Sequence, residues 1–570
     1  MTEVGSPAGD SRKKWRWTRI DIVYLDDRQN VTLVPGRFMK RLGMVLLATV
    51  GLAGLAQGAD LPTTKAPAPA PAPNCYSSLW NWLNTSAADC PLSYAGFTVY
   101  ATIDVGLGYS SNGAGFSPTY SNGVYSFVGK QSNGSKWLWT PNGINQTVVG
   151  INMKEPIGWG WSLVGVLETG FDPYSGELVN GPRSLVQNNG KALVLQSANA
   201  DSSRAGQFDN SAGYIGVSNP TFGTLTVGRV TSLTLDGVIA YDPMGGSYAF
   251  SALGYSGSYA GFGDTETNRA NTGVKYRVDY ENFHGGGLVQ WGGYDQGNGT
   301  TGLYQGDVGA DFNLFGGTPF AGTLSVDGIG SYAQNAVSLS NFTGTCATLT
   351  KGPFKGQTGC SDGIPMFYGP DDLKAMLSNN SGTMLLAKYR WGPVTLSGGW
   401  LWWQQANPSS DYLNGFETLG GYSVPATIVT TNKTIAKLFP TAWTNYTAYD
   451  DMRVVNVPFI GAKYAVTPQL DVIGAFYYEI QNNYNSSTTP CAAVPTTFVQ
   501  PNGSSSTVIR VNNTACAGTQ DAISFMVDYR PVKRVDLYAG VMISNVYAGL
   551  ANGYQQVQNI APTAGLRIKF

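Results

Sequence analysis

Apolar and polar residues alternate along most of the chain beyond residue 95, in segments of about ten residues. In the segment "GFTVYATIDVGLGY", Ile103 lies on the apolar face and Asp104 on the polar one. The last ten residues, "APTAGLRIKF", repeat the pattern, with Ile568 and Phe570 on one face and Lys569 on the other. Because successive side chains of a strand point to opposite faces, the alternation predicts strands with one apolar and one polar side.

Short turn signals separate these segments. They are "KEPIGW", "SNPTFG", "ENFHGG", "FGGTPF", "RWGPV", "AVTPQL" and "YRPVKR", and six of the seven contain proline. Each signal joins two alternating segments, so the seven turns predict seven hairpins and fourteen strands. The first segment and the last bring the predicted total to sixteen.

The connections at the opposite end of the predicted strands are mostly long. They cover roughly residues 110–143, 172–209, 231–268, 334–381, 406–450 and 483–519, with two short ones near 296 and 548. Short turns at one end and long polar loops at the other are typical of transmembrane β-barrels. The pattern predicts an all-β fold, a transmembrane antiparallel β-barrel of 16 strands, with 18 strands as the alternative.

One segment shows how polar the inner face would be. In "RANTGVKYRVDYE", Arg269, Lys275 and Arg277 share one face, while Val274 and Tyr276 share the other. A face with so many charges cannot be the core of a soluble protein. It suits the lining of a barrel, and the solvated outer face of a β-sandwich is the weaker alternative. Closing the sheet would pair the first strand with the last and leave no exposed edge.

The composition supports a membrane protein that crosses the bilayer with strands. Charged residues make up 12% of the chain, where a soluble globular protein carries about 25%. No run of about 18 apolar residues occurs, so helical spans are not expected. Without residues 1–58 the chain has 26 basic and 31 acidic residues, a net charge of −5. This balance offers no basic patch for nucleic acid.

The N-terminal region has the marks of an export signal. The apolar run "LGMVLLATVGLAGLA" follows Met39 and two basic residues, and it ends near the small residues Ala56 and Gly58. Residues 39–58 are therefore interpreted as a signal peptide, cleaved before Ala59. Residues 1–38 are excluded from the mature protein as an over-extended start, with a long n-region of the signal peptide as the weaker alternative. Residues 59–95 are expected to form a periplasmic Pro/Ala-rich segment, and residues 96–570 the barrel.

The six cysteines fall into three local pairs. The pairs are Cys75 with Cys90, Cys346 with Cys360, and Cys491 with Cys516. An exported chain meets oxidising conditions, so three disulfides are the simplest hypothesis. No Cys-x-x-Cys pair occurs and the only histidine is His284, so neither a metal site nor a cofactor is expected.

Four stretches of the sequence resemble a known family. A signal peptide followed by "ADLP", the strand "FTVYATIDVGLGY", the run "AGYIGVSNPTFGTLTVGRVTSLTLDGVIAYDPMG" and the terminal "LRIKF" are similar to general porins of Gram-negative bacteria, the sixteen-stranded trimeric family. The resemblance implies a homotrimer in outer-membrane lipid, with a water-filled channel for passive diffusion of ions and small hydrophilic solutes. It also implies long external loops and a terminal Phe570 read by the barrel-assembly machinery.

The resemblance further implies a pore constriction. In the family the third external loop folds into the barrel, where its acidic residues face basic residues on the wall. The matching loop here runs from Val230 to about residue 268, and its early part holds two acids, Asp236 and Asp242. The basic candidates on the wall are Arg229, Arg269, Lys275 and Arg277.

Two of these expectations stay open. Arg229 could instead pair with an acid near the base of the barrel or at a subunit contact. Val148 and Ser211 stand near positions where the family often has arginine. Together with the net charge of −5, these two replacements predict a mild preference for cations, which Arg269, Lys275 and Arg277 oppose.

Three other functions are possible from the sequence. Trp400, Trp402 and Trp403 in "GGWLWWQQ" suggest a substrate-selective channel, for example for sugars, although Trp400 and Trp402 share the apolar face of their strand. A secreted β-sandwich or adhesin is a further alternative. "GCSDG" at 359–363 matches a serine-hydrolase pattern but lacks the strand-to-helix context, and only His284 could act as its base. No enzyme activity is therefore predicted.

Overall fold

The fold is known from a computed structural model. It describes residues 75–113, 127–128, 134–174, 176, 211–253, 269–293, 298, 300–341, 346–348, 358–360, 373–409, 417–419, 422–424, 451–484, 491–499, 505–511, 513, 515–552 and 554–570. No helix within these ranges is long and apolar enough to cross a membrane.

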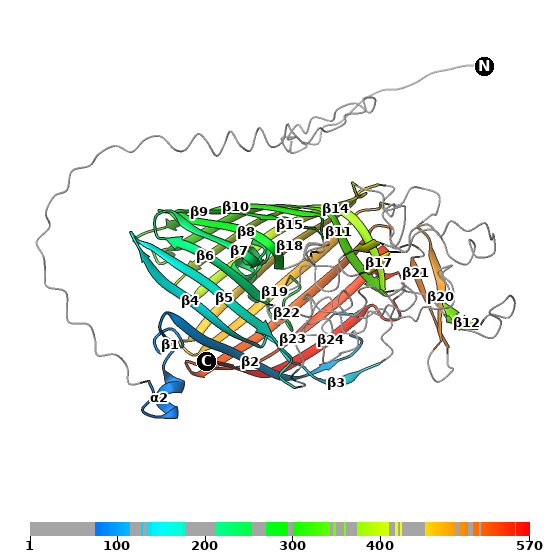
Figure 1. Ribbon diagram of the computed structural model, residues 1–570. Coiled ribbons are helices and arrows are strands. Elements are labelled where there is room, and N and C mark those ends of the chain that lie inside the picture. The colour runs from blue at the N-terminus through cyan, green and yellow to red at the C-terminus, as the bar shows by residue number, and fades with distance from the viewer. Residues whose placement is uncertain are drawn as a thin grey trace, which may run out of the picture. The chain divides into compact units, whose positions relative to one another are not determined.

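Sixteen long strands of the described residues form one antiparallel sheet that closes into a barrel (Figure 1). The strands are β2 (Phe97–Ser110), β4 (Val148–Gly158), β5 (Trp161–Gly170), β6 (Ala212–Asn219), β7 (Gly223–Thr231), β8 (Arg269–Tyr280), β9 (Phe283–Gln290), β10 (Gly302–Leu314), β11 (Gly322–Asn341), β14 (Leu373–Trp391), β15 (Val394–Ala406), β18 (Arg453–Thr467), β19 (Leu470–Gln481), β22 (Gly518–Val532), β23 (Val535–Ala548) and β24 (Gln558–Lys569). This confirms the predicted all-β barrel and its strand number.

Closure of the barrel depends on β2. Its first half pairs with β4, and its second half pairs with β24, from Thr102 opposite Lys569 to Gly108 opposite Thr563. Two short strands pair with β2 near its two ends, β1 (Leu92–Tyr94) and β3 (Lys136–Trp139). Counting these two, the sheet of the described residues has 18 strands. The barrel wall itself has sixteen, so the eighteen-strand alternative is not needed.

The two ends of the barrel differ as predicted. All seven turn signals lie between paired strands, and this end is called the turn end below. The opposite end, the loop end, carries the long connections. Three of these connections contain short hairpins, β12 (Cys346–Thr348) with β13 (Thr358–Cys360), β16 (Glu417–Leu419) with β17 (Tyr422–Val424), and β20 (Ala493–Val499) with β21 (Ser505–Val511).

The cysteines of the loop end need one correction. The predicted connections 334–381 and 483–519 contain all four cysteines and so place them outside strands. In the structure, however, Cys346 begins β12 and Cys360 ends β13, directly opposite each other in the register. The β12–β13 hairpin brings the backbones of these two cysteines side by side, and their spacing in the sequence does not predict this hairpin. Cys491 and Cys516 are joined in a disulfide.

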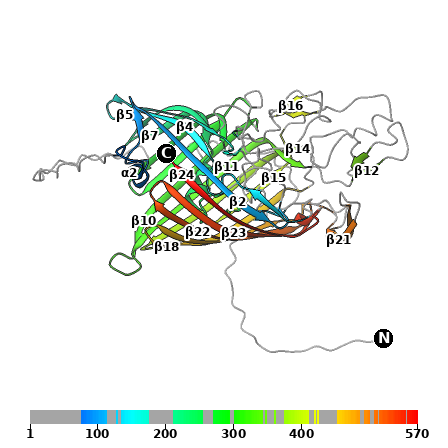
Figure 2. The same cartoon turned by 90° about the horizontal axis from the view of Figure 1, so that it is seen from below.

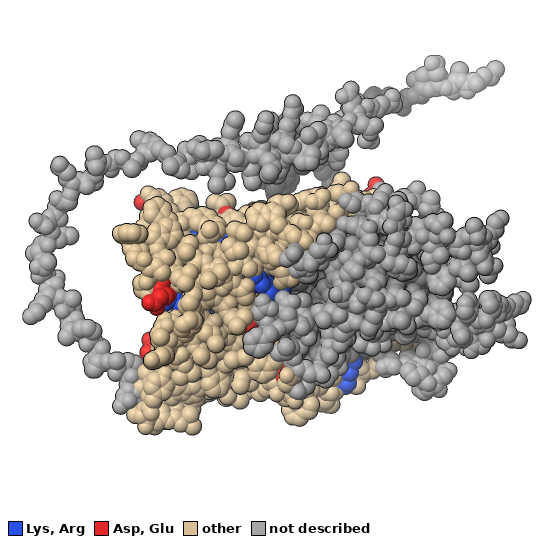
Figure 3. Space-filling model, in the orientation of Figure 1, with Lys and Arg blue, Asp and Glu red and all other residues tan. Residues whose placement is uncertain are grey.

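The wall of the barrel is apolar outside and polar inside. Most of one flank shows neither acidic nor basic atoms (Figure 3). Exposed apolar side chains of the strands include Val99, Ile151, Ile215, Val227, Val308, Leu385 and Ile460. Buried polar side chains of the strands include Asp104, Thr226, Lys275, Gln305, Asp327, Asn380 and Ser524. This is the reverse of a soluble protein, as expected for strands with lipid on one side and a lumen on the other.

A β-bulge interrupts the alternation in β8. Thr272 has a φ of 49°, and the β7–β8 register shifts between Gly228 and Val230. The extra residue reverses the facing of the side chains toward the loop end. Ala270, which the pattern places on the apolar outer face, is therefore fully buried in the interior cluster together with Val230.

A short segment before the barrel packs at the turn end. It contains α2 (Leu79–Asn84), where Ser78 caps the helix by accepting a hydrogen bond from the Asn81 N–H at 3.1 Å. A disulfide joins Cys75 to Cys90 around this helix. The ring of Trp82 lies 5.4 Å from that of Phe570, centroid to centroid, so α2 meets the end of the chain (Figures 1 and 2).

Candidate functional site

The connection after β7 contains a helix, α4 (Leu233–Tyr241). Ser232 caps its first turn by accepting a hydrogen bond from the Leu235 N–H at 3.1 Å, and Asp242 is its C-terminal cap. The residues of α4 that are buried are Leu233, Thr234, Leu235, Gly237, Val238 and Tyr241. The described part of this connection, residues 232–253, is called loop 3 below.

Helix α4 lies inside the barrel, against the wall. It contacts β9, β10, β11, β14 and β15. The Leu233 N–H donates to the side-chain oxygen of Gln305 on β10 at 2.7 Å. A Cβ atom on Gly237 would come within 2.4 Å of Ile329 and 3.0 Å of Leu386, so glycine lets the helix pack here without displacing the ends of these two side chains. The third loop is thus folded into the lumen, as the family resemblance implied.

Asp236 joins α4 to the basic residues of β8. Its carboxylate lies 2.6 Å from the ammonium of Lys275 and 3.1 Å from the guanidinium of Arg277. The hydroxyl of Thr231 donates to the other carboxylate oxygen at 2.9 Å. Three of the predicted constriction residues therefore meet at one point of the lumen.

The charged cluster continues along the wall beyond Asp236. Arg277 also lies 3.2 Å from the carboxylate of Asp307 on β10. On the neighbouring strand β11, Asp327 lies 3.4 Å from Nε2 of His284. Sequence reasoning did not select Asp307 and Asp327, although their position on the polar face of two alternating segments was a usable signal. The ion cluster below means Asp236, Lys275, Arg277, Asp307 and Asp327.

Arg229 and Arg269 lie apart from the cluster. The guanidinium of Arg229 donates to the side-chain oxygen of Asn271. Arg269 donates from Nε to the backbone carbonyl of Ser211 at 2.7 Å. The bulge at Thr272 explains the position of Arg269, because residues on its two sides no longer share the parity that placed Arg269 beside Lys275.

Asp242 has a different environment. Its carboxylate accepts a hydrogen bond from the hydroxyl of Tyr477 on β19 at 2.6 Å and from the Gly246 N–H at 2.7 Å. Asp242 is 6% exposed and Tyr477 is fully buried. Burial raises the pKa of the Asp242 carboxyl, and the two donated hydrogen bonds act in the opposite direction.

Further contacts carry loop 3 across the lumen to the far wall. A Cβ on Gly461 of β18 would lie 2.5 Å from the ring of Pro243, so the loop passes close to this strand. Phe250 packs edge-on against Tyr538 of β23, with 6.2 Å between ring centroids. The Tyr538 hydroxyl donates to the carboxylate of Asp104 on β2 at 2.6 Å. Loop 3 is thus tied to the wall on both sides of the lumen.

The sequence matches the family of Gram-negative porins over residues 83–546. This protein belongs to the Gram-negative porin family. It forms an outer-membrane channel for small solutes. No curated protein sequence matches the chain.

Several solved structures are similar to this chain. An anion-selective porin from Comamonas acidovorans has 14% identity and a TM-score of 0.46, with 83% of this chain and 99% of that chain covered. OmpT, an outer membrane protein of Vibrio cholerae, has 10% identity and a TM-score of 0.45 over 84% of this chain and 100% of that chain. Salmonella typhi OmpF in complex with daunomycin has 11% identity and a TM-score of 0.42 over 83% of this chain and 98% of that chain.

Proposed function

We propose that this porin is a general diffusion channel for ions and small hydrophilic solutes, that loop 3 sets its size limit, and that it has no enzymatic role. The observation that carries the proposal is the fixed position of α4, which is held against the wall by the ion pairs of Asp236 and by the close contact at Gly237. Because α4 is held in a fixed position, the narrowed part of the lumen keeps a constant width and does not open or close.

The charges in the lumen support a mild preference for cations. The ion cluster contains three carboxylates and two basic side chains. The wall of the barrel has a low dielectric constant, so the excess negative charge acts strongly on ions in a narrow passage. Arg269 is not one of the basic side chains of the cluster; its guanidinium donates to the Ser211 carbonyl at 2.7 Å.

The tryptophans of β15 give little support to a substrate-selective channel. Trp400 is 42% exposed on the outer face, with its ring N–H donating to the Asn456 side chain at 3.1 Å. Trp403 is buried, with the guanidinium of Arg453 over its ring at 5.0 Å. Neither ring offers an open stacking surface to a sugar in the lumen.

Solute permeation distinguishes a general channel from a selective one. Residues 59–570 would be reconstituted into liposomes, and the swelling rate measured with neutral sugars of increasing mass. We expect the rate to fall smoothly with solute size and to be equal for stereoisomers of one mass. A preference between stereoisomers would contradict the proposal. Planar-bilayer recordings of the same protein should show cation-shifted reversal potentials in a salt gradient.

The start of the mature chain and its assembly state are also proposals. We propose cleavage before Ala59, which N-terminal sequencing of the outer-membrane protein would test. We further propose a homotrimer that the barrel-assembly machinery inserts by reading Phe570. Native mass measurement of the detergent-solubilised protein should give three copies, and deletion of Phe570 should lower the outer-membrane yield while export continues.

A further inference from the structure

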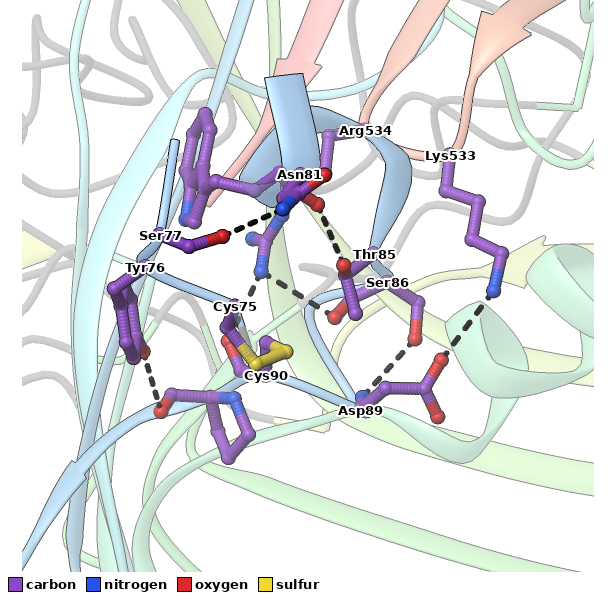
Figure 4. The surroundings of a disulfide bond; sticks show 12 residues. Cys75, Tyr76, Ser77, Asn81, Thr85, Ser86, Asp89, Cys90, Lys533 and Arg534 are labelled. Atoms are coloured by element: carbon purple, nitrogen blue, oxygen red, sulfur yellow. Dashed lines mark hydrogen bonds and ion pairs between the residues drawn. A yellow bond between two sulfur atoms is a disulfide. The ribbon is translucent and has the colours of Figure 1, made fainter. Parts of the chain in front are cut away.

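The segment before the barrel, residues 75–94, is a small folded unit, called the N-terminal segment below. The Cys75–Cys90 disulfide closes it around α2. The hydroxyl of Tyr76 donates to the carbonyl of Pro91 at 3.1 Å, which fixes its two ends together (Figure 4). The segment therefore has a defined surface of its own.

Arg534, in the turn between β22 and β23, holds this unit to the barrel. Its guanidinium donates to the carbonyls of Trp82 at 2.8 Å and Cys90 at 2.9 Å (Figure 4). It also lies 4.4 Å from the centre of the Trp82 ring. Arg534 is only 1% exposed, so the contact is a closed interface rather than a loose surface pair.

The N-terminal segment meets the outer face of the wall. Phe570 continues the parity of Leu566 and Ile568, the apolar side of β24, and its ring contacts Trp82. The strand β1 pairs with β2, with Leu92 opposite Val99. Directly opposite residues of an antiparallel pair point to the same face, so Leu92 continues the exposed apolar side of β2.

The surface that the segment leaves uncovered is apolar and aromatic. Tyr76, Leu79, Trp80 and Tyr94 are exposed by 62%, 71%, 66% and 88%. Exposed aromatic side chains also surround the rest of the turn end, namely Trp159, Phe222, Tyr280, Phe283, Phe315, Phe320, Tyr464 and Tyr529. In outer-membrane barrels, aromatic side chains at this level form the girdle at the membrane interface.

We propose that the N-terminal segment is a membrane-interface anchor, with Leu79, Trp80 and Tyr94 in the phospholipid headgroup region of the periplasmic leaflet. Its apolar surface is continuous with the lipid-facing side of β2, which already identifies the occupant as lipid. Tryptophan and tyrosine favour this region because one side of the ring is apolar and the other carries a polar group. The segment, expected from the sequence to lie in the periplasm, thus forms part of the membrane-bound surface.

Photolabelling tests the proposal directly. The mature porin would be reconstituted in phosphatidylethanolamine vesicles that contain a phospholipid with a diazirine near the headgroup, and labelled residues mapped by tandem mass spectrometry. We expect lipid adducts on Leu79 and Trp80. Ile509 on β21 is the matched control, since it is also 66% exposed but lies at the loop end. It should carry at least tenfold less label.

Hydroxyl-radical oxidation of the same vesicles separates the other occupants. If Trp80 is oxidised but carries no lipid adduct, its side chain faces water. If Trp80 is neither oxidised nor labelled by lipid, protein such as a second copy of the chain covers it. Either result overturns the proposal, provided that the exposed apolar residues of β2 are labelled. The double substitution Leu79→Ser and Trp80→Ser should remove most adducts from α2, residues 79–84, while heat-modifiable mobility of the barrel in SDS stays unchanged.

Discussion

Asp236 and Asp242 lie on one loop, six positions apart in the sequence, yet their surroundings are opposite. Asp236 contacts two cationic side chains of β8 within 3.1 Å and stays partly exposed to the lumen. Asp242 contacts a buried phenol and a backbone N–H, and no cationic side chain of the described residues forms an ion pair with it. The sequence predicts both acids as constriction residues, but their contacts give them separate roles. Asp236 contributes to the electrostatic field in the lumen, and Asp242 holds loop 3 to the wall.

The loss of the Asp242 carboxylate should have the largest effect. Asp242→Ala leaves the buried Tyr477 hydroxyl and the half-buried Gly246 N–H without their acceptor. Each unsatisfied buried group costs about 1–3 kcal/mol. We expect faster hydrogen exchange across residues 233–253 and noisier single-channel currents. Asp242→Asn, which keeps an acceptor oxygen, is the control and should change both much less; equal exchange in Asp242→Ala and wild type would contradict the anchoring role.

Enlarging Gly237 should have the next largest effect. A valine there overlaps Ile329 and Leu386, which come within 3.0 Å of the first added carbon. Overpacking of this kind costs about 1–3 kcal/mol. We expect α4 to move from the wall into the lumen and single-channel conductance to fall. Ala240→Val, on the exposed side of the same helix, should leave hydrogen exchange of α4 unaltered.

Neutralising Asp236 should change selectivity more than structure. Asp236→Asn leaves Lys275 and Arg277 with one carboxylate fewer, so the reversal potential in a salt gradient should shift toward anions. The shift should shrink at 1 M salt, where the Debye length is about 3 Å instead of about 10 Å at 0.1 M. Asp242→Asn should give a smaller shift, because its carboxylate is buried. Equal shifts for the two variants would remove the distinction between the acids.

The smallest effect is expected at the end of α4. The ammonium of Lys388 donates to the carbonyl of Ala240 at 2.7 Å and lies 5.0 Å from the centre of the Tyr241 ring. A cation at a helix C-terminus contributes about 0.3–1 kcal/mol. Lys388→Met should therefore raise hydrogen exchange in the last turn of α4 only slightly, and Lys388→Arg should not raise it. A change as large as that of Asp242→Ala would mean that the C-terminal anchor is electrostatic.

The barrel could be predicted from the sequence because its strands and tight turns are determined by residues close together in the chain. Each turn signal and each alternating segment depends on neighbouring residues, and all seven predicted hairpins are present. The bulge at Thr272 is an exception, since one extra residue reverses the facing of Ala270 without leaving a mark in the alternation.

The contacts of the site depend on positions far apart in the chain. Tyr477 and Asp242 are 235 residues apart, and the sequence carries no signal that joins a strand tyrosine to a loop acid. The sequence around Gly237 does not show that this position packs against Ile329, because that contact forms only when α4 lies on the barrel wall. The proximity of Asp236 to Lys275 and Arg277 could be predicted only from the family resemblance, which implies that the third loop faces basic residues on the barrel wall.

The pairing of β2 with β24 also determines when the barrel can close during folding. Ile103 faces Ile568 in this register, so the first barrel strand to be synthesised completes its hydrogen bonds with the last. Throughout synthesis and transit the edge of β2 is open, and an open strand edge is a template for pairing with other chains. Long-range closure of this kind is slow and exposes the chain to aggregation. Closure of the barrel therefore has to wait until β24 is available to pair with β2.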